Sequence, residues 1–257
     1  FSLYKKEIPD FDLNFINNAT EKCTEISFLH IEIEGDIAKY KGYLESYFKD
    51  LKINKNNFFT DVSNYVAYEM GQPTHSYDLN KINTNMPLIL DDNKGVNKFT
   101  SLLEKEIILN DPDLVFTNNN KVINLAGIMG SIETCCNQNT TNVLIECAYF
   151  KPEAIIGRSI KYDLHTDASH KFERGVDPLC QENVLRRIIN IIDDHSTIKK
   201  VEVYFDKDSS FKKTELDIDV YKINNILGID ITEDDYKHHL RNLGFIINTN
   251  IIVPSFR

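Results

Sequence analysis

The fold class follows most directly from residues 114–126, which read LVFTNNNKVINLA. Two short apolar runs, Leu114–Thr117 and Val122–Ala126, stand on either side of a polar segment rich in asparagine. Apolar runs of this length between turn-forming residues are typical of β-strands. Similar runs occupy Pro87–Leu90, Ile107–Asn110 and Val143–Tyr149. The region from Met86 to Phe150 is therefore predicted to consist mainly of short strands.

Helical periodicity flanks this region on both sides. Apolar residues recur at three- and four-residue steps in Ala38–Leu51, and Asp61–Met70 has Asp61 as a candidate cap and Gly71 as a terminator. Pro152 suits the first turn of a helix to about Tyr162, and Leu179–Ile192 predicts a longer helix. Val201–Phe205 returns to a strand. The sequence thus predicts an α+β fold, with mixed or antiparallel sheets and flanking helices.

A change in composition marks a candidate domain boundary near the C-terminus. Asp206–Ser210 is short, polar and free of apolar residues, which is typical of a linker. We therefore expect a main domain over residues 1–206 and a truncated small α+β module over 207–257. Within that module, Thr232 can cap a helix that Gly244 ends. The chain begins with Phe1 and stops in mid-pattern at Arg257, so we interpret it as a fragment of a longer protein.

The overall charge excludes one class of function. Lys and Arg number 29 against 39 Asp and Glu, which gives a net charge of −10. A protein that holds nucleic acid through its overall field is normally basic, so any such contact here must be local. Five cysteines without a C-x-x-C motif favour a reducing cytosol over a disulfide framework. No apolar run approaches the ~18 residues of a membrane span, so we expect a cytoplasmic protein without membrane contact.

General catalytic motifs are missing from the sequence. It contains no G-x-S-x-G, no G-x-x-x-x-G-K-[ST] and no H-E-x-x-H. The step Gly127-Ile128-Met129-Gly130 is interpreted as a turn between strands and not as a phosphate loop. His165 and His170 are five residues apart without a second ligand pair, so no metal site is expected. A metalloenzyme built on these two histidines is kept only as a third hypothesis.

Three stretches of the sequence are more unusual than the rest. Residues 71–78 (GQPTHSYD) hold His75 in a proline turn after a helix, and residues 164–177 (LHTDASHKFERGVD) are dense in polar groups. In residues 140–148 (TTNVLIECA), the single carboxylate of Glu146 follows an apolar run. Burying a carboxylate is costly unless it finds a hydrogen-bond donor.

These stretches carry a resemblance to a known family. Together with residues 61–66 and 127–130, they resemble, in order along the chain, the bacterial-type phenylalanyl-tRNA synthetase beta subunit in the part that includes its proofreading domain. The residues after the predicted linker resemble the start of the next module, at Leu227-Gly228, Leu243-Gly244-Phe245 and residues 253–257 (VPSFR). One such motif would be modest evidence, whereas five in order are specific.

The resemblance implies a hydrolytic domain that removes tyrosine wrongly attached to the phenylalanine tRNA. An apolar synthetic site discriminates poorly against an added hydroxyl, so a second site is needed. A buried acceptor for the tyrosine hydroxyl would be left unpaired by phenylalanine, at a penalty of ~1–3 kcal/mol. Glu146 matches the family's pocket glutamate and is our candidate acceptor. The alternative is a strand-end glutamate paired with Lys or Arg.

Five further residues match the family's site. Gly127 and Gly130 would let the backbone approach the bound ring, unless they form a plain turn. Thr166 and Ala168 would form a wall that leaves space for the ring, unless they are ordinary small loop residues. His75 matches the histidine near the scissile ester, where it could orient water or bond the terminal ribose. The alternative for His75 is a turn residue bonded to backbone. Because an aminoacyl ester is activated, no protein nucleophile is needed.

Local charge and two departures complete the comparison with the family. Residues 151–174 contain five Lys or Arg and four Asp or Glu. This local excess of one positive charge favours a binding surface for the tRNA acceptor end. A solvated face with internal ion pairs explains the same charges equally well. Asn54 stands where the family has arginine, and Ser131 where it has a second glycine, and both changes bear on proofreading efficiency.

The parent enzyme of the family joins phenylalanine to tRNA(Phe) with ATP and Mg²⁺ as an alpha2-beta2 tetramer. The resemblance therefore implies the alpha subunit, tRNA(Phe) and tyrosine or tyrosyl-tRNA(Phe) as partners. It places the ATP and magnesium sites outside this segment, for which we expect no cofactor. The second hypothesis is a non-catalytic domain that braces the assembly or guides tRNA after its pocket has decayed.

Overall fold

The structure is a computed structural model, which describes residues 2–110, 112–205 and 212–257. Its contacts divide the chain into two compact units, Phe1–Val176 with Cys180–Ser209, and Asp177–Leu179 with Ser210–Arg257. The expected linker Asp206–Ser210 lies outside the described residues, so the boundary at residue 206 stays a prediction. No helix in the described parts of the chain is long and apolar enough to cross a membrane.

A four-stranded antiparallel sheet forms the centre of the larger unit. Its strands follow the order β11-β2-β10-β3. They span Thr197–Phe205, Cys23–Glu34, Asn142–Phe150 and His75–Asp78 respectively. The long central strands alternate cleanly, because successive side chains of a strand point to opposite faces. In β10, Val143, Ile145 and Cys147 belong to one apolar core, and Leu144 and Ala148 to another.

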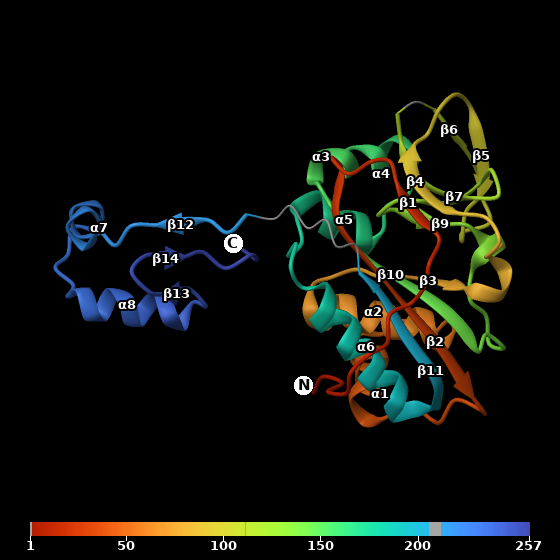
Figure 1. The fold of residues 1–257 in the computed structure, drawn as a ribbon, viewed down its shortest axis with the longest axis horizontal. Helices are drawn as coiled ribbons and strands as arrows, with labels where there is room; N and C mark the ends of the chain where they lie inside the picture. Colours follow the sequence, from red (N-terminus) through yellow and green to blue (C-terminus); the bar gives the residue numbers. More distant parts are fainter. Residues whose placement is uncertain (1, 111, 206–211) are drawn as a thin grey trace. The chain divides into compact units, whose positions relative to one another are not determined.

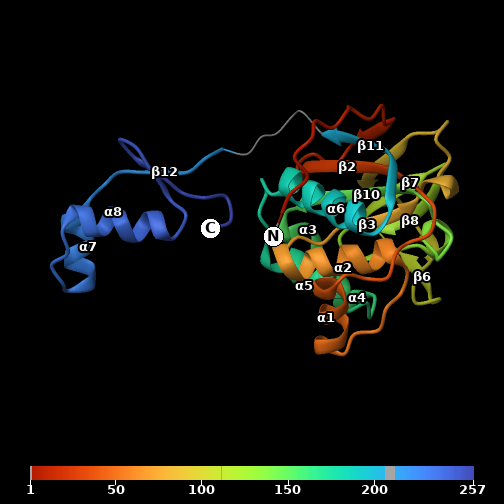
Figure 2. The same ribbon diagram turned by 90° about the horizontal axis from the view of Figure 1, so that it is seen from below.

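Three helices cover one face of this sheet, as Figures 1 and 2 show. They are α1 (Gly42–Leu51), α2 (Phe58–Met70) and α6 (Gln181–His195). A buried arginine on α6, Arg187, ties α6 to α2 through two hydrogen bonds to Glu69, at 2.6 and 2.9 Å. The larger unit also contains two short 3-10 helices, η1 (Leu79–Lys81) and η2 (Ile132–Thr134).

The opposite face of the sheet packs against a second, five-stranded sheet with the order β1-β4-β7-β8-β9. The β1–β4 pair is parallel and the other pairs are antiparallel. A separate hairpin, β5–β6, joins this region. The bounds are Phe15–Asn17 for β1, Leu88–Asp92 for β4, Asn97–Thr100 for β5, Glu106–Leu109 for β6, Leu114–Asn118 for β7, Lys121–Leu125 for β8 and Met129–Gly130 for β9. The predicted α+β class with mixed sheets and flanking helices is confirmed.

Several predicted helix boundaries were wrong for local reasons. The first helix begins at Gly42 and not at Ala38. The second begins at Phe58, because Asn57 caps it by accepting from Thr60 N–H, while Asp61 is buried and accepts from the Tyr40 hydroxyl. The predicted helix after Pro152 is split by Gly157, whose φ of 80° ends it. Its two pieces are α3 (Pro152–Ile155) and α4 (Arg158–Lys161).

Two segments that carry site residues also differ from the prediction. His75 was expected in a turn, but it is the first residue of strand β3. No helix was predicted at Thr166 and Ala168, but Thr166 caps helix α5 (Asp167–Arg174) and Ala168 lies in its first turn. Reciprocal hydrogen bonds between Thr166 and Ser169 form a capping box, which makes this helix start a fixed feature.

The smaller unit is a short α+β arrangement. A three-stranded sheet of order β12-β14-β13 accompanies two helices. Thr232 caps α8 as predicted, accepting from Asp235 N–H at 3.1 Å. The bounds are Glu215–Leu216 for β12, Val220–Leu227 for α7, Glu233–Asn242 for α8, Ile246–Ile247 for β13 and Ile251–Ile252 for β14.

Candidate functional site

Glu146 is a buried carboxyl between the two sheets of the larger unit. In β10 it shares a face with Leu144 and Ala148, which pack in the core against the second sheet. Glu146 is only 4% exposed. Burial raises its pKa to about 8, although hydrogen bonds from Tyr77 and Asn124 act in the opposite direction. The carboxyl is therefore mostly protonated at neutral pH.

Two side chains of the protein itself hold this carboxyl. The hydroxyl of Tyr77, on β3, donates to Oε2 of Glu146 at 2.8 Å, and the amide of Asn124, on β8, reaches the same oxygen at 3.3 Å. Asn124 also donates to the Tyr77 hydroxyl oxygen at 2.8 Å, which closes a triangle. Tyr77 is 0% and Asn124 3% exposed, so water does not weaken these bonds.

Sequence reasoning missed Tyr77 and Asn124, although one signal was available. Tyr77 stands two residues after His75, so the two side chains share a face of β3. That relation becomes visible only if residues 75–78 are recognised as a strand. Asn124 is fixed by the pairing of distant strands, for which the local sequence carries no signal.

His75 stands directly opposite Glu146 in the register of β3 and β10. Its ring packs on Gly130, where an added Cβ would lie only 2.2 Å from Cε1 of His75. The ring is edge-on to Tyr77, with 4.4 Å between the centroids. Nε2 of His75 has no hydrogen-bond partner among the described residues. Burial lowers the pKa of His75 to about 4, so the ring is neutral at physiological pH.

Thr166 links helix α5 to the turn that contains the two candidate glycines. Its hydroxyl accepts from Ser169 N–H at 3.1 Å and donates to the carbonyl oxygen of Ile128 at 3.2 Å. Ile128 lies between Gly127 and Gly130, so the helix start and the turn are joined directly. Ala168 is half-buried and packs against the same core as the second sheet.

Gly127 is required by both its backbone and its surroundings. Its φ of +70° favours glycine, and an added Cβ would lie 3.0 to 3.2 Å from side-chain atoms of Ile155, Phe150 and Phe172. The open side of Gly127 is thus filled by the protein's own side chains, as the open side of Gly130 is filled by His75. The roles of both glycines in approaching a bound ring stay predictions.

The candidate residues therefore converge from distant parts of the sequence. His75 pairs with Glu146, Gly130 supports His75, and Thr166 holds the turn that contains Gly130. Chemically, this arrangement offers a neutral imidazole with a free ring nitrogen close to a buried carboxyl. Such a pair can orient water or a hydroxyl group, and it can bind a neutral polar group in an otherwise apolar setting.

The raised pKa of Glu146 predicts how stability depends on pH. A group whose folded pKa is about 8 stabilises the fold fully below its unfolded value near 4.5 and loses that contribution as pH rises to 8. The pKa of His75 is lowered to about 4, so this residue changes the stability only at pH values below its unfolded pKa near 6.5. Between pH 6.5 and 8, stability should therefore fall by about 1–2 kcal/mol.

Urea denaturation of the wild type and of Glu146→Gln at pH 6.5 and pH 8 checks this expectation. Glutamine cannot ionise, so the variant should show little change in the free energy of unfolding between the two pH values. Equal pH dependence in the two proteins would contradict the assignment of the titration to Glu146.

Comparison with known proteins places this arrangement in a family. The sequence model of the B3/4 domain matches residues 36–197, which include all the candidate site residues. The chain belongs to the B3/4 domain family. The B3/4 match covers α1 to α6 and the strands β3 to β10, and it ends at the first residue of β11.

Relatives of this B3/4 domain chain include phenylalanine–tRNA ligase beta subunits. The phenylalanine–tRNA ligase beta subunit of Francisella tularensis is 30% identical over 214 residues, which are 80% of this chain and 27% of that protein. The beta subunit of Colwellia psychrerythraea is 33% identical over 210 residues, 77% of this chain and 26% of that protein. The chain thus spans about a quarter of the length of these relatives. The resemblance to the beta subunit is confirmed.

A solved structure also aligns with the B3/4 domain chain. It is an N-terminal fragment of the phenylalanyl-tRNA synthetase beta subunit from Pyrococcus horikoshii. The alignment covers 99% of this chain and 72% of that one, with 12% sequence identity and a TM-score of 0.48.

The two departures from the family pattern lie in different settings of the B3/4 domain. Asn54 is exposed in the segment between α1 and α2. Ser131 is buried and caps η2, accepting from Glu133 N–H at 3.2 Å, with a φ of −86° that any residue can adopt. The backbone at Ser131 therefore does not require glycine.

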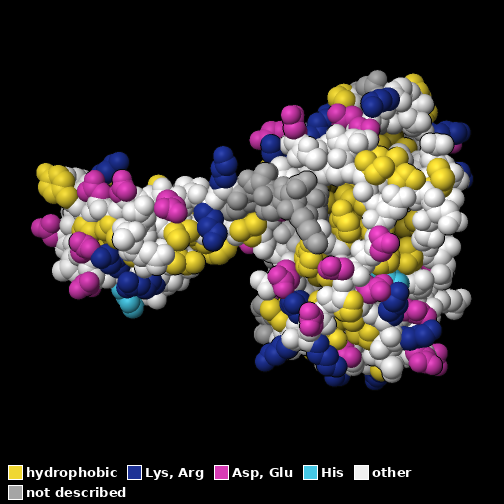
Figure 3. All heavy atoms as spheres, in the orientation of Figure 1, with side chains coloured by type: hydrophobic (Ala, Val, Ile, Leu, Met, Phe, Trp, Pro, Cys, Tyr) yellow, Lys and Arg dark blue, Asp and Glu magenta, His cyan; other side chains and the backbone are white. Residues whose placement is uncertain are grey.

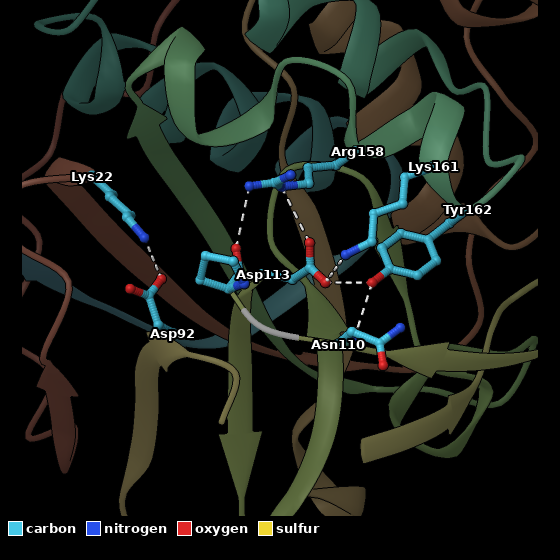
Figure 4. Close-up of polar contacts among 8 residues, drawn as sticks. Lys22, Asp92, Asn110, Asp113, Arg158, Lys161 and Tyr162 are labelled. Carbon is cyan, nitrogen blue, oxygen red and sulfur yellow. Dashed lines mark hydrogen bonds and ion pairs between the residues drawn. The ribbon is translucent and has the colours of Figure 1, made fainter. Parts of the chain in front are cut away.

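The basic side chains of residues 151–174 are partly engaged within the domain (Figure 4). Asp113, with a fully buried side chain, lies 2.8 Å from Nζ of Lys161 and 3.1 Å from Nε of Arg158. It also accepts a hydrogen bond from the Tyr162 hydroxyl. On the face drawn in Figure 3, Lys and Arg alternate with Asp and Glu. These contacts favour internal ion pairing for Arg158 and Lys161 and do not test a tRNA contact.

The metal hypothesis finds no support in the described residues. His165 and His170 are both exposed, and no group of three His, Cys, Asp or Glu able to hold a metal ion occurs in residues 2–110, 112–205 or 212–257. A role of these two histidines as ligands would need a further donor.

Proposed function

We propose that this chain is part of a phenylalanine–tRNA ligase beta subunit whose larger unit hydrolyses tyrosyl-tRNA(Phe). Membership of the B3/4 family and the named relatives support the parent enzyme. The observation that carries the hydrolytic function is the direct pairing of His75 with Glu146 across β3 and β10. It sets a neutral imidazole beside a buried carboxyl, next to the Gly127–Gly130 turn.

The chemistry requires positioning more than activation. The ester bond between an amino acid and a tRNA ribose is reactive, so a water molecule held by Nε2 of His75 suffices as the nucleophile. His75 accepts a hydrogen bond from that water while it is neutral, which its lowered pKa ensures. Glu146 binds the far end of the aromatic side chain, and Thr166 and Ala168 form the wall beside it.

The partners follow from the parent enzyme. We expect the beta subunit to assemble with an alpha subunit as an alpha2-beta2 tetramer in the cytoplasm and to bind tRNA(Phe). ATP and Mg²⁺ belong to aminoacylation, and the residues described here are assigned no part in binding them. The division into an editing domain over residues 1–206 and the start of a following module over 207–257 belongs to the same proposal.

One observation favours a second function, a non-catalytic domain that braces the assembly or guides tRNA. Side chains of the protein fill the open sides of Gly127 and Gly130, and Tyr77 covers Glu146. In a decayed pocket these contacts would be permanent. In an active pocket, the His75 ring and its neighbours must yield space to the substrate.

Deacylation of tyrosyl-tRNA(Phe) by the chain distinguishes the two functions. We expect hydrolysis well above the spontaneous rate, and at least a tenfold loss in Ala168→Trp, because the indole fills the space beside the helix start. His170→Trp on the exposed face of the same helix is the control and should retain activity. Absence of hydrolysis, or full activity of Ala168→Trp with native thermal stability, would favour the non-catalytic domain.

A further inference from the structure

The hydroxyl of Tyr77 already bonds the carboxyl that we propose as the acceptor for a substrate hydroxyl. It donates its single proton to Oε2 of Glu146 at 2.8 Å, because its own oxygen already accepts from Asn124 at 2.8 Å. Asn124 contributes a second donor to the same carboxyl oxygen at 3.3 Å. Oε2 of Glu146 thus accepts two hydrogen bonds from side chains that are themselves buried, whereas Oε1 has no partner among the described residues.

The hydrogen bonds of Glu146 affect how strongly the site prefers tyrosine over phenylalanine. A hydroxyl-reading site rejects the analogue without the hydroxyl because a buried polar group is then left unpaired. Because Tyr77 and Asn124 already satisfy Oε2, a phenylalanine ring leaves only Oε1 of the carboxyl without a partner. A tyrosine ring must in turn compete with Tyr77 for Oε2.

We propose that Tyr77 is a specificity-determining residue that lowers the preference of this site for tyrosine over phenylalanine by occupying one oxygen of Glu146, Oε2, with its own phenol. This inference rests on the proposed function and deepens it. It predicts that the wild-type site hydrolyses tyrosyl and phenylalanyl esters with only a modest difference in rate, and that removing one oxygen atom restores selectivity.

The surroundings of Tyr77 make that removal a clean experiment. Its ring is fully buried and packs edge-on to His75 at 4.4 Å, so Tyr77→Phe keeps the ring in place and deletes only the hydroxyl. Asn124 remains as a donor to Glu146. Oε2 of Glu146 then has a vacant hydrogen-bond position of the size of one hydroxyl group.

The test compares single-turnover hydrolysis of tyrosyl-tRNA(Phe) and phenylalanyl-tRNA(Phe). The ratio of the two rates should rise about tenfold or more in Tyr77→Phe, which corresponds to one buried acceptor gained. Adding Glu146→Gln to that variant should return the ratio towards the wild-type value. Tyr149→Phe, three residues after Glu146 and on the other face of β10, is the control and should leave the ratio unchanged.

Each outcome decides a separate question. Hydrolysis with an unchanged or lower ratio in Tyr77→Phe overturns the role of Tyr77 and leaves the proposed function standing. If neither protein hydrolyses either ester, the proposed function fails, and the relative affinities for free tyrosine and phenylalanine, measured by NMR titration, decide the role of Tyr77. A tyrosine-to-phenylalanine affinity ratio that does not rise in Tyr77→Phe overturns it.

Discussion

Replacing His75 by alanine should lower the rate of tyrosyl-tRNA(Phe) hydrolysis by about 100-fold or more, the usual contribution of a positioned acid–base group. The reason is geometric, because Nε2 of His75 has no hydrogen-bond partner among the described residues and His75 pairs directly with the buried Glu146 across β3 and β10. Single-turnover deacylation at pH 7 measures the effect. His170→Ala, an exposed histidine of α5, serves as the control and should retain the wild-type rate.

The pH profile adds a signature that a merely structural role would not give. With a pKa of about 4, His75 stays neutral above pH 5.5, so its protonation should not limit the rate between pH 5.5 and 7. A rate that rises with a midpoint near 6.5 would contradict the neutral imidazole. So would a His75→Ala variant that is as active as the wild type.

Replacing Asp113 by alanine should destabilise the larger unit by about 3 kcal/mol. Asp113 is the shared partner of two cations and a phenol, and its side chain is fully buried (Figure 4). Its loss leaves Arg158 and Lys161 without their counter-ion beside the core. Because these cations are about one third exposed, at 29% and 33%, water offsets part of the penalty, and the estimate stays at the lower end of the range for buried pairs.

Urea denaturation of Asp113→Ala against Asp92→Ala measures this difference. Asp92 pairs with Lys22 at 2.5 Å near the same region, but both side chains are about one third exposed, at 36% and 35%. That pair should contribute less than about 1 kcal/mol. An equal loss of unfolding free energy in the two variants would show that burial of Asp113 does not set the strength of its contacts.

The sequence was sufficient to predict the elements that are long and regularly patterned. The apolar run at residues 143–149 lies in β10, and Asn119 and Asn120 form the turn between β7 and β8, as predicted. Strand β3 was missed because its four residues, His75–Asp78, are mostly polar and follow a proline. Its place in the sheet comes from pairing with β10, which lies about 70 residues further along the chain.

The candidate site was predictable as a set of residues but not as a network. His75, Glu146, Gly130 and Thr166 were selected from separate motifs, and the structure joins them through pairing, packing and one hydrogen bond. The occupation of Glu146 by Tyr77 could not be foreseen, because it depends on three strands meeting at one carboxyl. The same meeting raises the pKa of Glu146, since burial is a property of the fold and not of the local sequence.

The most direct test of the account is a crystal structure of the chain with a non-hydrolysable amide analogue of tyrosyl-adenosine. We expect the tyrosine ring beside the Gly127–Gly130 turn and the start of α5, with the amide carbonyl next to Nε2 of His75. The phenol should point towards Glu146. A ligand bound elsewhere on the larger unit, with the His75 ring still packed on Gly130 and Tyr77 undisturbed, would contradict the proposed site.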